Sequence, residues 1–162
     1  EGALYATATL VTGEVYPVER VVYHDKGMDI ALLKISQTST DKAEAPAFAV
    51  LELAEEADLR PGDVVYTLGN PLGLGLAVSS GIVSDVDRVV DTYTLPCVMN
   101  TADISQGSSG GALLNVYGHV VAVTSGAYTY GNNMYLAVPI APVLEADWTA
   151  QGQTLAEVAR AS

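Results

Sequence analysis

The sequence DISQGSSGGALLN, residues 103–115, places Ser109 in a glycine-rich turn that runs directly into an apolar, strand-like segment. A serine between glycines suits a nucleophile, because the backbone can bend tightly and leave its N–H groups free to bind an oxyanion. One such donor lowers a reaction barrier by about 2.7–4 kcal/mol. The five residues GSSGG also fit a flexible turn between two strands, and by themselves they leave both interpretations open.

GSSGG also matches the G-x-S-x-G turn, in which a strand leads into a nucleophilic serine and a helix follows it. Here the residues after Ser109 alternate as in a strand, and the Tyr117-Gly118 turn leads into another strand-like segment. The context therefore excludes the strand–turn–helix arrangement.

Most of the chain has the pattern of short strands separated by Gly, Pro and Asn turns, which predicts an all-β sandwich or barrel. The predicted strands cover residues 3–11, 15–23, 29–35, 48–53, 64–68, 76–86, 93–99, 111–115, 119–124 and 134–141. Only the C-terminal end is predicted to be helical, with a turn of helix over 143–148 and a helix over 154–160. Thr154 and Glu157 have the spacing of a capping box at its start.

Composition narrows the classes of protein. The 162 residues fit one domain that buries a core without metal or disulfide staples. The net charge of −12 works against binding to nucleic acid or anionic membranes, which need basic patches. Cys97 is the only cysteine, which fits a reducing compartment and an exported bacterial protein equally well. No apolar run reaches 18 residues, so no membrane span is predicted, and no metal or cofactor is expected.

The segment 102–115 resembles the active-serine segment of trypsin-like serine peptidases of the HtrA (Deg) type. Other stretches resemble the same family in the same order, namely residues 21–35, 69–74, 80–84 and 135–140. The resemblance extends from about residue 8 to residue 140, which makes it far more specific than GSSGG alone.

The resemblance implies a role for each matching position. Ser109 is the expected nucleophile, and Asp29 is expected to orient a catalytic histidine. Without the family, Asp29 would be interpreted as an ordinary turn or capping residue. The N–H groups of Gly107 and Ser109 are expected to form the oxyanion hole. Thr124-Ser125-Gly126 is expected to pair with an extended substrate, main chain to main chain.

The implied fold is a trypsin-like double β-barrel with an incomplete first barrel. Residues 1–54 are the expected remainder of the first barrel, residues 62–142 the second barrel, and residues 143–162 a C-terminal helical tail. Residues 55–62 are less apolar than the predicted strands on either side, and they mark the expected boundary. An incomplete barrel has exposed strand edges, so self-association through it is a further expectation.

A catalytic triad also needs a histidine as base, and the chain has only His24 and His119. Neither lies where the family keeps its base, and both are predicted to be ordinary surface residues. The family's histidine precedes the first strand predicted here. Either the chain begins after that segment or the natural protein is an inactive homologue, and the start in mid-barrel favours the first explanation.

The predicted function is that of a serine endopeptidase domain acting on polypeptides, exported or at the surface of a bacterium, and inactive as this 162-residue chain. The alternative is a catalytically silent homologue that binds peptides. A purely structural β-domain ranks last, because it leaves the glycines around Ser109 unexplained.

Asp103 is a departure from the family. It lies six residues before Ser109, at the position that forms the floor of the primary specificity pocket in trypsin-like folds. HtrA-type enzymes usually have a small apolar residue there. A carboxylate would favour Lys or Arg in the substrate. Alternatively, Asp103 points away to cap the turn with Ser105, and Ile104 fills the floor.

Overall fold

The computed structural model describes residues 3–41, 48–54, 59–128 and 131–161. The chain divides into two compact units. One comprises residues 1–25, 31–50 and 145–162, and the other comprises residues 26–30 and 51–144. The boundary predicted over residues 55–62 lies partly outside the described residues.

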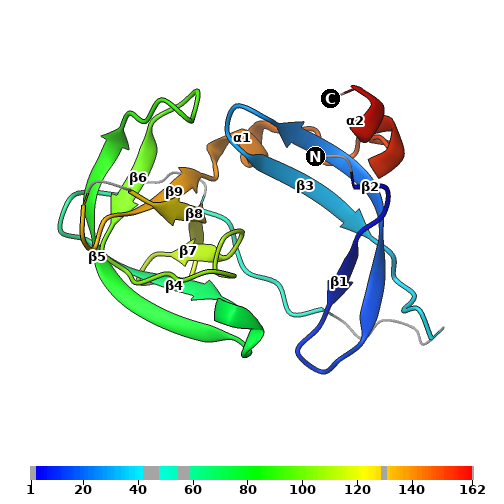
Figure 1. Cartoon of the computed structure of the whole chain (residues 1–162), viewed down its shortest axis with the longest axis horizontal. Coiled ribbons are helices and arrows are strands. Elements are labelled where there is room, and N and C mark those ends of the chain that lie inside the picture. Colours follow the sequence, from blue (N-terminus) through cyan, green and yellow to red (C-terminus); the bar gives the residue numbers. More distant parts are fainter. Residues whose placement is uncertain (1–2, 42–47, 55–58, 129–130, 162) are drawn as a thin grey trace. The chain divides into compact units, whose positions relative to one another are not determined.

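The larger unit contains a closed six-stranded antiparallel barrel with the strand order β4-β5-β6-β9-β8-β7 (Figure 1). Its strands are β4 (Val64–Gly69), β5 (Ala77–Arg88), β6 (Cys97–Asn100), β7 (Ala112–Leu114), β8 (Val120–Ala127) and β9 (Tyr135–Pro139). Alternation of apolar residues along these strands directs one set of side chains into the barrel. The buried core contains Ala54, Val65, Val83, Val98, Ala102, Leu113, Val121, Ala122 and Ala137.

The pairing of β7 fixes the position of the turn that carries Ser109. In one direction β7 pairs with β4, with Ala112 opposite Leu68. In the other direction it pairs with β8, with Ala112 opposite Val123. The turn therefore emerges where two neighbouring strands hold its C-terminal end. A short 3-10 helix, η1 (Pro71–Gly73), lies between β4 and β5.

The smaller unit contains an open sheet with the order β1-β2-β3, formed by β1 (Thr7–Thr9), β2 (Val15–Asp25) and β3 (Ile30–Ile35). Tyr16 is fully buried and its ring packs edge-on against Phe48, with the ring centroids 5.2 Å apart. Helix α1 (Ala141–Glu145) follows β9 and, except for Glu145, belongs to the larger unit, whereas α2 (Leu155–Ala161) belongs to the smaller unit. One closed barrel and one open sheet confirm the predicted all-β class and the incomplete first barrel.

The strand predicted over residues 48–53 is wrong. Only Leu53 forms a bridge, and it pairs in parallel with Val120 at the start of β8. Val50 is 84% exposed, so this apolar run does not bury one face as a strand of a sheet would. A run of apolar residues with the length of a strand does not form a strand where no neighbouring strand pairs with it.

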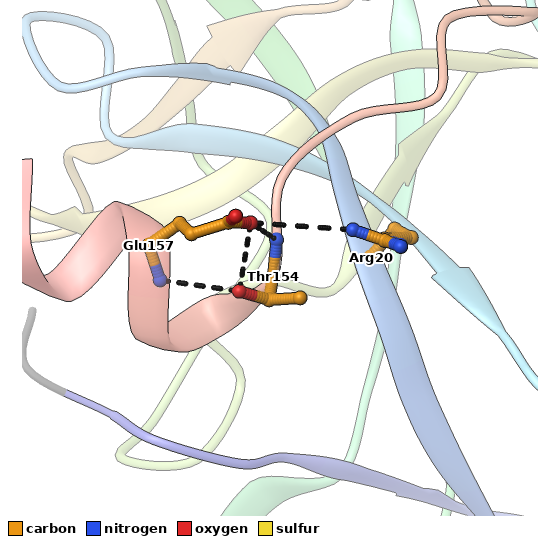
Figure 2. Close-up of polar contacts among 3 residues, drawn as sticks. All are labelled: Arg20, Thr154 and Glu157. Atoms are coloured by element: carbon orange, nitrogen blue, oxygen red, sulfur yellow. Dashed lines mark hydrogen bonds and ion pairs between the residues drawn. The ribbon is translucent and has the colours of Figure 1, made fainter.

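The capping box at the start of α2 is confirmed (Figure 2). The Thr154 hydroxyl accepts from the Glu157 N–H at 3.2 Å, and the Thr154 N–H donates to the Glu157 carboxylate at 2.7 Å. The Thr154 N–H, together with the Thr154 hydroxyl that donates to the same carboxylate at 2.8 Å, lowers the pKa of the Glu157 carboxyl. Arg20 of β2 lies 4.0 Å from the same carboxylate. The box satisfies N–H groups that the first turn of a helix leaves unpaired.

Replacing Thr154 with Ala is expected to lower the free energy of unfolding by about 1 kcal/mol, since the N-cap acceptor is lost. The measurement is denaturant unfolding followed by circular dichroism. Thr154→Ser keeps the hydroxyl and is the control, expected to stay close to the parent. Equal effects of the two substitutions would show that the methyl group, not the cap, is responsible.

Candidate active site

Two adjacent serines in the turn have different environments. Ser108 is buried, with 6% of its surface exposed, and its hydroxyl oxygen accepts from the Ser105 N–H at 3.3 Å. Ser109 is exposed. Of the two, Ser109 is the one that a molecule arriving from solvent can reach.

The backbone N–H groups of residues 107–111 fall into two sets, those bonded inside the protein and those without an acceptor. Three of them are used inside the protein: those of Ser108, Gly110 and Gly111 donate to the carbonyl oxygens of Ser105, Thr124 and Ser108 at 2.9, 2.8 and 2.9 Å. Within the described residues, the N–H groups of Gly107 and Ser109 have no acceptor. Unpaired N–H groups two residues apart beside a serine hydroxyl are the donors that an oxyanion hole requires.

Gly107 adopts a conformation that favours glycine. Its φ is +94°, and a Cβ atom there would lie 2.8 Å from the Asn70 carbonyl oxygen. The preceding carbonyl, that of Gln106, accepts from the Leu72 N–H at 2.8 Å. The 3-10 turn after β4 therefore fixes the peptide unit that carries the Gly107 N–H.

The Ser109 hydroxyl donates to the carbonyl oxygen of Ser125 at 2.6 Å. No imidazole among the described residues accepts this hydrogen bond. His119 is engaged elsewhere, with its Nε2 3.2 Å from the Glu52 carboxylate, and His24 is an exposed residue near the end of β2. The two histidines thus have the surface character predicted for them.

Thr124 of β8 is hydrogen-bonded to the turn that carries Ser109. It is 2% exposed, and its hydroxyl lies 2.6 Å from the Ser108 carbonyl oxygen and 3.1 Å from that of Gly111. Its main-chain N–H and C=O both bond to the turn, the N–H to Gly111 and the C=O to Gly110, each at 2.8 Å. This differs from the expectation that Thr124 pairs with substrate, because its main-chain groups are already used within the protein.

Asp29 lies in the turn before β3 and is exposed. Its φ of +52° is in the left-handed region, where Asp is one of the few non-glycine residues found with any frequency. Its N–H donates to the Lys26 carbonyl oxygen at 3.4 Å, which closes the turn. Lys26–Ile30 belong to the same compact unit as Ser109.

The Asp103 carboxylate accepts a hydrogen bond from the Tyr135 hydroxyl of β9. This bond is the main reason that the pKa of Tyr135 is raised. The Asp103 carbonyl oxygen accepts from the Thr67 hydroxyl at 3.3 Å. The sequence offered a pocket floor or a cap with Ser105, and the contact with Tyr135 was not foreseen.

A cavity of about 140 Å³ lies beside the same segment. It is lined by Thr67, Gly69, Pro71, Ala77, Ser79, Asp103, Ile104, Ser105 and Ser108. Neither Ser109 nor residues 124–126 line it, so the cavity belongs to the β4–β5 side of the 103–108 segment.

Tyr93 and Tyr135 are the residues near this site that sequence reasoning missed. Each hydroxyl bonds a residue 32 positions away, Ser125 in one case and Asp103 in the other. Tyr93 and Tyr135 lie inside segments predicted as strands, where an aromatic residue is ordinary. A pattern along one strand carries no information about such a partner.

Comparison with known proteins agrees with this arrangement. Residues 2–123 match the model of the trypsin-like peptidase domain. The serine protease Do-like HtrA of Bacillus subtilis is 35% identical over 133 residues, covering 77% of this chain and 28% of that protein. The serine protease PepD of Mycobacterium tuberculosis is 34% identical over 133 residues, covering 77% and 27%.

Among solved structures, the HtrA-type protease AlgW with a bound decapeptide matches with a TM-score of 0.76 and 27% identity, covering 89% of this chain and 43% of that one. The serine endoprotease from Yersinia pestis matches with a TM-score of 0.70 and 26% identity, covering 88% and 47%.

The barrel, the glycine-rich turn and these matches define a trypsin-like serine peptidase domain. The chain belongs to the trypsin-like peptidase family, and its relatives are of the HtrA (Deg) type. It spans less than half the length of each of these relatives and solved structures.

Two features are absent from the described residues. No helix among them is long and apolar enough to cross a membrane. They also contain no group of three or more His, Cys, Asp or Glu side chains that could hold a metal ion.

Proposed function

We propose that this chain is the larger part of a serine endopeptidase domain in which Ser109 attacks the substrate carbonyl. The N–H groups of Gly107 and Ser109 stabilise the oxyanion, and Asp29 orients the histidine that removes the Ser109 proton. Ser125 and Gly126 pair with an extended polypeptide substrate. Thr124 is left out of this substrate strand, because its main-chain groups bond to the turn.

The observation that carries the proposal is the pairing of N–H groups in the Ser109 turn. Five consecutive residues have a backbone donor, and only the two predicted for the oxyanion hole lack an acceptor within the described part of the chain. A flexible Gly/Ser turn gives no physical reason for three of these N–H groups to be hydrogen-bonded and for these two to be free. The left-handed Asp29 is a second point of support, since unusual backbone conformations concentrate at active sites.

The base is proposed to be a histidine outside residues 1–162. His119 is paired with Glu52, and the Ser109 proton is directed to a carbonyl oxygen, which cannot take it up. A serine hydroxyl without an adjacent base stays protonated and is a weak nucleophile. The chain alone is therefore proposed to be inactive.

A fluorophosphonate probe tests the proposal, because it labels a serine only where a base activates it. The full-length protein is expected to become labelled at Ser109, and its Ser109→Ala variant is expected to stay unlabelled. Ser108→Ala is the matched control, since Ser108 is buried next to Ser109. Labelling at Ser108, or none at all in the full-length protein, would contradict the proposal.

A catalytically silent peptide-binding module is the second candidate. The hydrogen bond from Ser109 to the Ser125 carbonyl favours it, because this is a stable arrangement for a serine that has no catalytic role. Such a module would bind an extended peptide at β8 and leave the fluorophosphonate unreacted. Covalent labelling of Ser109 excludes it.

The proposed substrate class is polypeptide, and the proposed location is outside the bacterial cytoplasm. The AlgW structure contains a bound decapeptide, and a Marinomonas relative, 35% identical, is described as a periplasmic serine endoprotease. β1 and β3 are the edge strands of the open sheet, and they are the proposed place for self-association.

A further inference from the structure

The segment Tyr93–Leu95 lies between β5 and β6 and contacts two parts of the larger unit that are distant in the sequence. We call it the connecting segment. At one end, the Tyr93 and Ser125 hydroxyl groups share a hydrogen bond of 2.5 Å. The Ser125 carbonyl oxygen in turn accepts the hydrogen bond of Ser109. Tyr93 is thus one residue removed from the proposed nucleophile.

Ser125 is the extra residue of a β-bulge. In the pairing of β8 with β9, Thr124 lies opposite Ala137 and Gly126 lies opposite Leu136. A bulge redirects the side chain and main-chain groups of the extra residue away from the regular ladder. Ser125 can therefore direct its carbonyl to Ser109 and its hydroxyl to Tyr93.

The Tyr93 ring is held by packing and by a turn. It lies against the buried cluster of Cys97, Met99 and Leu136. The backbone N–H of Tyr93 donates to the Val90 carbonyl oxygen at 3.0 Å. With the ring anchored in this way, the direction of the hydroxyl toward Ser125 is fixed by the core of the barrel unit.

The other end of the connecting segment holds the turn before Asp29. The Thr94 N–H donates to the Gly27 carbonyl oxygen at 3.0 Å. The Leu95 N–H donates to the Met28 sulfur at 3.1 Å, and Met28 is fully buried. Asp29 follows directly, so its position depends on these two contacts.

Gly27 permits this approach because it has no side chain. A Cβ atom at Gly27 would lie 2.4 Å from Thr94 Cγ2 and 2.9 Å from Thr94 Oγ1. Both distances are shorter than non-bonded atoms allow, so a larger residue at Gly27 would require the Thr94 side chain or the backbone of the connecting segment to move.

We propose that the connecting segment mechanically couples the Asp29 turn to the Ser125 bulge, and that Tyr93 is a positioning residue for Ser109. The roles of Asp29 and Ser109 rest on the proposed function, whereas the coupling does not. A change in the conformation of the Asp29 turn is then expected to alter the Ser125 bulge, and a change in the bulge is expected to alter the turn. Removing the Tyr93 hydroxyl loosens both the Ser109 turn and the Asp29 turn, although Tyr93 forms no hydrogen bond with Ser109 or Asp29.

Hydrogen exchange in the full-length protein measures this coupling without any need for activity. In Tyr93→Phe, the ring and its packing remain, and the lost hydroxyl is expected to speed amide exchange about fivefold in peptides covering residues 26–30 and 105–111. Tyr117→Phe, at a residue that is 80% exposed, is the control and is expected to change neither peptide. Unchanged exchange in either peptide of Tyr93→Phe overturns the coupling.

A pair of substitutions at the other end tests the same coupling in reverse. Gly27→Ala is expected to speed exchange in residues 105–111 as well as locally. Adding Thr94→Ala removes the two nearest atoms that the new methyl would meet and leaves only Thr94 Cβ at 3.2 Å, so it is expected to restore most of the slow exchange. Faster exchange in residues 26–30 with no change in 105–111 contradicts the proposal.

Labelling of Ser109 separates the two hypotheses. In a full-length protein that reacts with a fluorophosphonate, the Ser109 proton goes to the base, so Tyr93 acts on the turn through the Ser125 bulge and the neighbouring Thr124, which bonds to Gly110 and Gly111. Tyr93→Phe is then expected to react about tenfold more slowly, and Ser125→Ala combined with Tyr93→Phe is expected to be no slower than Ser125→Ala alone. Additive losses would show that Tyr93 does not act through Ser125. If the parent protein does not react, the proposed function fails, and the exchange of residues 26–30 and 105–111 still decides the coupling.

Discussion

Residues 1–162 by themselves are expected to show no measurable hydrolysis of an unstructured protein such as casein. The reason is the state of the Ser109 hydroxyl, which donates to the Ser125 carbonyl oxygen while no imidazole of the described residues accepts from it. Loss of the serine or the histidine from a triad lowers kcat by about 10⁶-fold. What remains is the modest acceleration due to binding and oxyanion stabilisation.

The control is the same chain with Ser109→Ala, which is expected to give an identical baseline. The full-length protein, measured side by side, is expected to hydrolyse casein. Hydrolysis by the 162-residue chain that disappears in Ser109→Ala would contradict the prediction and would require a base among the residues present. Activity that persists in Ser109→Ala would indicate a contaminating protease instead.

Local patterns in the sequence were sufficient for most of the barrel. The strands β4 and β5 lie within two residues of their predicted limits, because alternation and the flanking glycine turns are local features. The capping box of Thr154 and Glu157 was predictable for the same reason, since both partners lie in one turn of helix. The strand predicted over 48–53 failed because pairing, which no local pattern reports, is limited to Leu53.

The candidate site, too, was predictable only where its residues lie close together in the sequence. GSSGG, a motif of five consecutive residues, indicated Ser109 and the N–H groups beside it as candidates, and the resemblance over residues 8–140 favoured this interpretation over a flexible turn. The contacts of Tyr93 with Ser125 and of Tyr135 with Asp103 each join a strand of the barrel to a loop residue 32 positions away, so they depend on the tertiary arrangement. The sequence indicated which residue types were suitable for chemistry, but not which distant hydroxyl groups would hold them.

If the full-length protein is the proposed endopeptidase, Asp103 is expected to give it a preference for Lys or Arg at the cleaved position. Tyr135 holds the carboxylate through one hydrogen bond, and a carboxylate has four lone-pair positions, so acceptor capacity remains for a basic side chain. The Thr67 hydroxyl fixes the backbone of the same residue. A charge-assisted hydrogen bond to a substrate cation contributes about 1.5–3 kcal/mol.

The measurement is kcat/KM for a panel of peptides that differ only in Arg, Lys, Val or Ala at the cleaved position. Asp103→Ala is expected to lower kcat/KM for Arg and Lys by about 10- to 150-fold and to leave Val and Ala within a few-fold, since 1.4 kcal/mol is one factor of ten. Asp103→Asn is the closer control, because it keeps the size and can still accept from Tyr135 while removing the charge. It is expected to lose the same preference. A preference for Val in the parent that survives Asp103→Ala would show that the carboxylate serves only to hold Tyr135.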